Sequence, residues 1–256
     1  MGLRRRLFGL TGHLRSLHGP HAAPALASAE GGGGEQPPEE RHRKDYAPPD
    51  FLNPTVQLSF KLGVGAEPTL VRGELACERI GPASAPLVLD GEELSLKSLS
   101  IDGVAVSAAH YTVTDETNAS TTLTIAAAAL PSASTFTVTT EVEIFPEANK
   151  QGEGLYLSDS TFCTQCEPQG FRRITYHQDR PDVLAVYTVV VEGDAASCPV
   201  LLSNGNLIEE GGAGEGRHYT KWLDPFPKPS YLFALVAGDL GFLQVTGRLF
   251  SALPSS

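Results

Sequence analysis

The sequence is short of cysteine and tryptophan and has no long apolar run. Of its 256 residues, four are cysteine and one is tryptophan. No uninterrupted apolar stretch approaches the roughly 18 residues that a membrane-spanning helix requires, so we expect no membrane partner. Hydrophobic residues make up 41% of the chain and charged residues 19%, which is the composition of a globular protein with a sizeable core.

Basic charge is also scarce, except near the N-terminus. The formal net charge is −11, which argues against a nucleic-acid partner and favours a soluble protein. The exception is residues 1–29, which hold Arg4, Arg5, Arg6 and Arg15 and no acidic residue. Leucines recur there at three- and four-residue spacing, as on one face of a short helix. This composition predicts a transit peptide for a plastid or mitochondrion, with a cytoplasmic protein as the alternative.

Two of the cysteines, Cys163 and Cys166, form an isolated CxxC motif, which can act as a redox pair or as half of a zinc site. A structural zinc site needs four ligands, and the sequence has no second CxxC and no HxxxH pair to complete it. A redox motif should open a helix, whereas Glu167 and Pro168 follow here without helical periodicity. We therefore favour two ordinary thiols, kept reduced inside an organelle, and expect no cofactor in this chain.

The next part of the sequence changes from low complexity to alternation. Residues 30–44 (EGGGGEQPPEERHRK) predict a flexible linker that, with residues 1–29, forms a disordered N-terminal extension. From Asp45 the apolar residues alternate, most clearly in 55–62 (TVQLSFKL). Further strand-like segments are 70–80, 86–91, 93–103, 110–115, 121–127, 136–145, 183–194, 199–206, 216–227 and 230–240, and many of them are bounded by glycine, proline or aspartate. This series predicts an all-β domain, an antiparallel β-sandwich or open curved sheet.

One segment, Gly154–Ala185, has few alternating apolar positions and many charges, which is typical of a loop that carries chemistry. Within it, Gln165 and Glu167 are separated by one residue, so in an extended backbone their side chains point the same way. A carboxylate and an amide aimed at one cavity suit the capture of a protonated amine.

Five segments stand out together: KDYAPPDF, LDGEELSLKSLSIDG, GLYLSDSTFCTQCEPQGFRRITYHQDRPDVLA, LLSNGN and GRHYTKWLDPFPKPSYLFALVAGDL. As a set they resemble the amino-terminal β domain of aminopeptidase N, in the bacterial and plastid alanyl-aminopeptidase branch of peptidase family M1. The resemblance covers residues 45–241, and residues 242–256 form a divergent tail. It implies a saddle-like β domain that sits on a thermolysin-like zinc domain.

The resemblance also implies roles for two residues. Glu167 matches the glutamate that pairs with the α-ammonium group of the first residue of a peptide, and Gln165 matches the glutamine that lines the pocket for that residue's side chain. Without the resemblance, a surface ion pair of Glu167 with Arg172 or Arg173 is the simpler interpretation.

Other charged and aromatic residues of these segments are interpreted as structural. Charges between a loop and a buried strand usually tie the loop to the sheet, which we expect of Asp179, Arg180 and Asp182. The aromatic side chains of Trp222, Phe226 and Tyr231 are expected to pack in the core or against a following domain.

The sequence contains neither the His-Glu-x-x-His motif of a zinc aminopeptidase nor the family's Gly-x-Met-Glu-Asn motif. We therefore expect a chain truncated before the zinc domain and inactive alone, with zinc only in the full-length parent enzyme. Its expected partners are a peptide N-terminus and the missing catalytic domain; whether the chain is itself an enzyme stays open. The alternative is a non-catalytic β-sandwich binding module, and a redox function of the CxxC motif is a third hypothesis.

Overall fold

The structure is a computed structural model that describes residues 42–116 and 120–241. The predicted transit peptide, most of the predicted linker and the divergent tail lie outside the described residues. A short 3-10 turn, η1 (Arg43–Asp45), precedes a compact unit that begins at Ala47. Among the described residues, no helix is long and apolar enough to cross a membrane.

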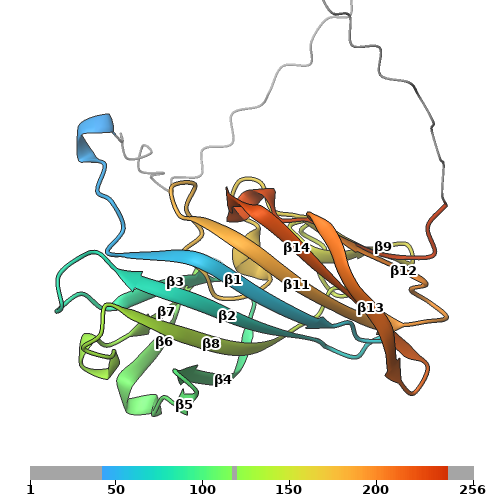
Figure 1. The fold of residues 1–256 in the computed structure, drawn as a ribbon, viewed down its shortest axis with the longest axis horizontal. Coiled ribbons are helices and arrows are strands. Elements are labelled where there is room, and N and C mark those ends of the chain that lie inside the picture. The colour runs from blue at the N-terminus through green and yellow to red at the C-terminus, as the bar shows by residue number, and fades with distance from the viewer. Residues whose placement is uncertain (1–41, 117–119, 242–256) are drawn as a thin grey trace, which may run out of the picture. The chain divides into compact units, whose positions relative to one another are not determined.

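The largest element of the compact unit is an eight-stranded sheet with the strand order β13-β14-β11-β1-β2-β8-β4-β5 (Figure 1). Its strands are β1 (Phe51–Lys61), β2 (Thr69–Arg79), β4 (Ser95–Ile101), β5 (Val104–Ala105), β8 (Thr135–Ile144), β11 (Leu184–Asp194), β13 (Asn206–Gly214) and β14 (Arg217–Pro229). The prediction of an all-β domain with an open sheet is confirmed, since the described helical elements are only short 3-10 turns.

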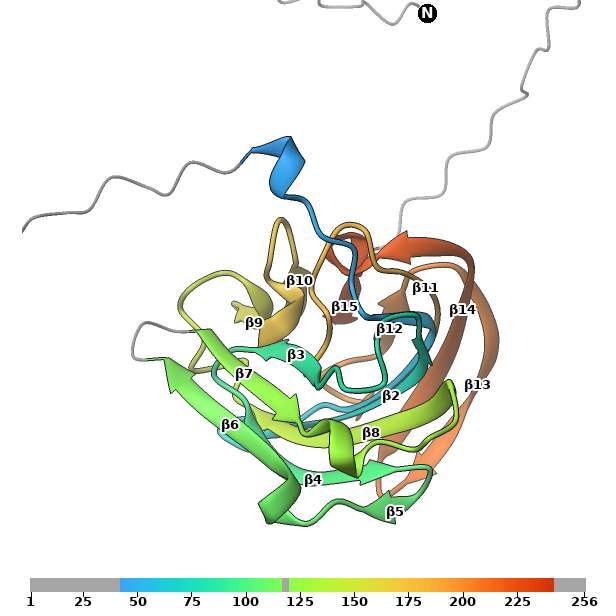
Figure 2. The same ribbon diagram turned by 90° about the vertical axis from the view of Figure 1, so that its left-hand side faces the viewer.

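Two smaller sheets complete the compact unit. One has the order β12-β15-β10-β9 and the other β3-β7-β6. Their strands are β3 (Leu87–Gly91), β6 (Tyr111–Glu116), β7 (Ser120–Ile125), β9 (Gly154–Ser158), β10 (Thr161–Gln165), β12 (Val200–Ser203) and β15 (Leu235–Gly238). Figure 2 shows that the large sheet curves and that both small sheets lie on its inner side. The core therefore fills the space between one large sheet and two small ones.

Alternation in the sequence explains which side chains face this core. In β1 the predicted inward residues Val56, Leu58 and Phe60 are at most 2% exposed, and the intervening residues are exposed. β11 alternates in the same way along its whole length. Because neighbouring residues of a strand point to opposite faces, this period of two buries one face of the large sheet.

One feature of the pairing differs from the antiparallel prediction. β1 and β11 pair in parallel, with Thr55 opposite Val186, while the other described strand pairs are antiparallel. Parallel pairing requires a long connection. More than a hundred residues separate the end of β1 at residue 61 from the start of β11 at residue 184.

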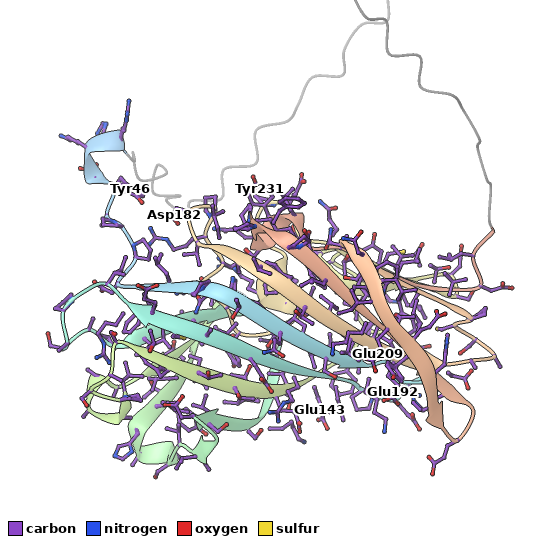
Figure 3. The ribbon with its side chains drawn as sticks, viewed as in Figure 1. Tyr46, Glu143, Asp182, Glu192, Glu209 and Tyr231 are labelled. Carbon is purple, nitrogen blue, oxygen red and sulfur yellow. The ribbon has the colours of Figure 1, made fainter. Side chains whose placement is uncertain are left out.

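Ion pairs link neighbouring strands of the large sheet, and Figure 3 labels their glutamates. They join Lys97 to Glu143 (3.1 Å), Arg217 to Glu192 (2.5 Å) and Lys221 to Glu209 (3.6 Å). Pairs near a surface contribute only about 0–1 kcal/mol each, so the apolar core between the sheets holds the fold together.

Candidate functional site

The segment that carries the predicted site begins as a hairpin. β9 and β10 pair with Gly154 opposite Gln165, and the turn between them places Asp159 at a φ of 53°. The prediction of a continuous loop over Gly154–Ala185 is therefore wrong for its first twelve positions, residues 154–165. The apolar pattern hides this hairpin because its strands are half-buried on both faces and do not alternate.

A tight turn follows β10 and presents Glu167. The amide of Gly170 donates to the carbonyl oxygen of Cys166 at 2.9 Å, and the Glu167–Pro168 peptide bond is cis. A Cβ atom on Gly170 would lie 2.4 Å from the carbonyl oxygen of Gln165, so the turn closes only with glycine there. Cys166 is buried, whereas Gln165 and Glu167 on either side of it are exposed.

The structure brings the two predicted site residues to one surface but not into a cavity. The Gln165 amide nitrogen donates to the backbone oxygen of Glu167 at 3.4 Å, so the two residues are in contact. The Glu167 side chain is exposed on this surface. Within residues 42–116 and 120–241, Glu167 has no ion pair. A carboxylate of this kind is free to receive a cation.

The competing interpretation, an ion pair of Glu167 with Arg172 or Arg173, is also wrong. The Arg172 guanidinium binds the carboxylate of Asp179 at 3.1 Å and lies 3.7 Å from that of Asp90. Asp179 in turn accepts a hydrogen bond of 2.5 Å from Ser230 and one from the Arg172 backbone amide. Asp179 therefore ties the loop to η5 (Ser230–Leu232), the structural role that its sequence context predicts.

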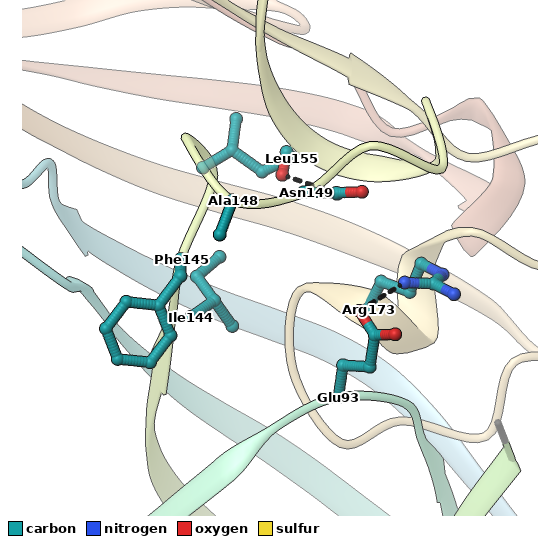
Figure 4. Close-up of a pocket in the computed structure, with 7 residues that line it drawn as sticks. All are labelled: Glu93, Ile144, Phe145, Ala148, Asn149, Leu155 and Arg173. Atoms are coloured by element: carbon teal, nitrogen blue, oxygen red, sulfur yellow. Dashed lines mark hydrogen bonds and ion pairs between the residues drawn. The ribbon is translucent and has the colours of Figure 1, made fainter. Parts of the chain in front are cut away.

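Arg173 is the second fixed point of the loop, and its side chain is only 6% exposed. Its guanidinium binds Glu92 and, at 2.8 Å, Glu93, both in the turn after β3, and lies 3.9 Å from Glu153. Figure 4 shows Arg173 and Glu93 on one side of a hollow of about 210 Å³. Burial raises the pKa of Glu92, although the Arg173 charge opposes this shift. The sequence did not predict these ion pairs of Arg173, because its glutamate partners are distant from it in the chain.

Between these fixed points the chain runs through the core. Residues 173–179 are all buried, and His177 exchanges two backbone hydrogen bonds with Asp90 of β3. The His177 ring packs edge-on against Phe171, of the turn η4 (Phe171–Arg173), with centroids 5.1 Å apart. Burial lowers the pKa of His177 to about 4, so its ring is neutral at neutral pH. The second half of the predicted loop is thus a core segment that supports Glu167.

The CxxC thiols do not have the surroundings of a redox pair. Cys163 is half-buried and Cys166 is 2% exposed, and both are free thiols. Burial raises the pKa of the Cys166 thiol, with a smaller contribution from the charge of Asp179, whereas reactive thiols need a lowered pKa. In the part of the chain that the structure describes, no three His, Cys, Asp or Glu side chains gather to hold a metal ion.

The aromatic residues expected to pack behave differently from one another. Trp222 packs against the core, and Tyr231 is half-buried. Phe226 of β14 is 76% exposed, and Leu184 of β11 and Leu232 of η5 are 47% and 46% exposed. Of the two expected roles of Phe226, packing in the core of this domain is therefore excluded.

Comparison with known proteins identifies relatives of this chain. Residues 68–232 match the model of the Peptidase M1 N-terminal domain. The chain is 49% identical over 218 residues to aminopeptidase N of Caulobacter vibrioides, covering 82% of this chain and 24% of that protein.

Solved structures give the same picture. The crystal structure of Legionella pneumophila aminopeptidase A in complex with aspartic acid matches 77% of this chain and 22% of that one, with a TM-score of 0.70 and 34% identity. A mutant M1 zinc metallopeptidase from Deinococcus radiodurans, bound to a Tyr-Ser-Ala substrate, shares the fold with a TM-score of 0.60 at 19% identity, over 74% of this chain and 42% of that one. The chain spans about a quarter of the length of the curated relative it matches.

Proposed function

Because this chain belongs to the peptidase M1 family, as its N-terminal domain, we propose that it anchors the free N-terminus of a peptide for a zinc aminopeptidase. In this proposal the Glu167 carboxylate binds the α-ammonium group of the first residue, and Gln165 contacts that residue's side chain. The observation that carries the proposal is the exposed Glu167 carboxylate, which has no ion-pair partner in the described residues and stands on a rigid support.

The chemistry of this pair fits such an anchor. A carboxylate attracts an ammonium group strongly once the two are shielded from water, and an acetylated or internal amide offers it no charge. An anchor at a fixed distance from a hydrolytic centre would therefore restrict cleavage to the first peptide bond. Zinc, which supplies the activated water in such enzymes, would be held by residues other than those described here.

The proposal also assigns a role to the exposed apolar surface of Leu184, Phe226 and Leu232. Single apolar side chains are common on surfaces, but a phenylalanine that is 76% exposed suits a contact surface, and its strand pairs with the one that begins at exposed Leu184. We assign this surface to the contact with the zinc domain of an M1 enzyme.

The test is a chimera in which this domain replaces the N-terminal domain of the Caulobacter vibrioides relative. We expect the chimera to hydrolyse an alanyl substrate with a free amino group. Glu167→Gln should lower kcat/KM by about 30- to 1000-fold, corresponding to roughly 2–4 kcal/mol for a desolvated charge pair. The matched control is Glu210→Gln, which removes an exposed carboxylate on β13 and should leave kcat/KM unchanged.

An equal loss of kcat/KM in the Glu167→Gln and Glu210→Gln variants, or no loss in either, would show that Glu167 is not the anchor. The alternative, a non-catalytic binding module, predicts that the chain alone is a monomer that captures a partner other than a zinc domain. In the proposed function, this chain alone hydrolyses no alanyl substrate.

A further inference from the structure

A second hollow lies away from Glu167, where four connecting segments meet. It is lined from the β1–β2 connection (Gly63–Thr69), the chain after β8 (Pro146 and Glu147), the β9–β10 hairpin (Leu157–Phe162) and the β11–β12 connection (Ser197 and Cys198). Its volume is about 210 Å³. An apolar cavity of roughly 150 Å³ is enough to hold benzene, so the hollow has room for one small ring.

The floor of this hollow is apolar and is built into the core. Cys198 is 3% exposed, and Phe162 packs against the core cluster. Leu157, Pro146 and Val64 form further apolar walls. Both walls and floor belong to strands or to connections anchored by hydrogen bonds, such as the Gly63 amide to the Thr69 hydroxyl at 3.1 Å. The hollow is therefore preformed.

The rim carries charge of one sign. Glu67, Glu147 and Asp159 line the hollow, and no lysine, arginine or histidine among the described residues does. Within the described residues these three carboxylates have no ion pair or side-chain hydrogen bond. Lys150, which follows Glu147 closely, donates to the Glu147 backbone oxygen at 2.8 Å rather than to a carboxylate.

We propose that this hollow binds a small organic amine, a single positive charge on a compact apolar body such as an arylethylamine. The apolar floor takes the ring, and the carboxylate rim selects the cation over a neutral or anionic group of the same shape. A metal ion does not fit, because in the part of the chain described no three carboxylates lie close enough together to hold one.

The experiment is an amide chemical-shift titration of this chain with three ligands of matched shape. We expect phenethylamine to shift the amides of residues 63–69, 157–162 and 197–198 in a saturable way. The neutral 2-phenylethanol should bind at least about fivefold more weakly, and phenylacetate more weakly still. Added salt should weaken the binding of the amine only, because salt screens the attraction between exposed charges.

Variants distinguish the contribution of the rim to amine binding from the contributions of the apolar floor and of the proposed anchor. Glu67→Gln, Glu147→Gln and Asp159→Asn should each weaken phenethylamine binding about two- to fivefold, as expected for exposed charge pairs, and leave 2-phenylethanol binding unchanged. Asparagine is well suited to position 159, where φ is 53°. Glu167→Gln should leave amine binding at the hollow unchanged, so this proposal and the proposed function fail independently.

Two results would overturn the proposal. One is equal affinity for the amine and the alcohol, which would make the rim irrelevant. The other is amine-induced shifts confined to residues 165–167, which would place amine binding at the anchor alone.

Discussion

At the scale of single residues, His177 makes the stability of the folded state depend on pH. Its side chain is fully buried, and both ring nitrogens lack a hydrogen-bond partner among the described residues. Of the charged groups packed against the ring, the Asp90 carboxylate favours protonation, but burial outweighs it and lowers the pKa from 6.5 to about 4. The folded state therefore binds the proton less tightly than the unfolded state does.

This pKa difference predicts a loss of stability in acid. A group whose pKa is lower in the folded state contributes its full stability above its unfolded pKa of 6.5, and that stability is lost as the pH falls toward 4. The loss should reach about 3 kcal/mol. We expect wild type to lose about that much more than His177→Phe between pH 7.5 and pH 4, measured by urea unfolding.

The control for this prediction is His110→Gln, which changes an exposed histidine and should follow the wild-type pH profile. Parallel profiles for wild type and His177→Phe would show that other groups cause the acid sensitivity.

The site residues themselves were predictable only in part. The motif that contains Gln165 and Glu167 pointed to both, and their exposure on either side of buried Cys166 follows the alternation of an extended chain. The partners of Arg173 were not predictable, because Glu92 and Glu93 lie about eighty positions earlier and reach it only through the pairing of sheets. Ser230, which fixes Asp179, carries no signal in the local sequence.

At the scale of elements, the turn after β10 depends on Gly170. Its Cβ position is blocked by the backbone of Gln165 and Cys166, which cannot move aside as a flexible side chain would. Gly170→Ala should therefore lower the free energy of unfolding by about 1–3 kcal/mol and shift the amide resonances of residues 165–167.

The matched control is Gly212→Ala in the edge strand β13, where nothing lies within 4 Å of the new Cβ. Its free energy of unfolding should change by less than about 0.5 kcal/mol. If the two alanine variants are equally stable, the turn tolerates a side chain and does not fix Glu167.

Strands with alternating burial were predictable, whereas a strand with almost no burial was missed. β1, β2 and β11 alternate and match their predicted segments. β13 was missed because nearly all of its residues are exposed, so it has no apolar period and is held by its pairing with β14. The local sequence indicates which residues of a strand are buried, but it does not indicate which other strand pairs with it.

At the scale of the whole molecule, the centre of the large sheet joins distant parts of the chain. β1 and β11 are neighbours although one small sheet (β3, β6 and β7) and half of the other (β9 and β10) lie between them in sequence. This explains why the all-β class was predictable from local patterns, while the sheet order and the parallel pair were not.

The same topology predicts slow folding. Pairing of distant strands must overcome the entropy of closing a long loop, so we expect refolding in milliseconds to seconds rather than microseconds. Trp222, the only tryptophan, packs against the core from β14 and should report this step in stopped-flow fluorescence. A complete fluorescence change within about a millisecond would contradict the prediction.

The turn after β10 has both exposed and buried positions, and these differ in how freely they can vary. Gln165, Glu167 and Gln169 face outward, while Cys166 and Gly170 face inward and residues 173–179 are core. In the proposed function, a mutation at Gln165, Glu167 or Gln169 changes recognition at little cost to folding, whereas a mutation at buried Cys166 or Gly170 damages both. Divergence of binding preference among descendants of this domain, or in a laboratory library, should therefore concentrate on those three outward positions.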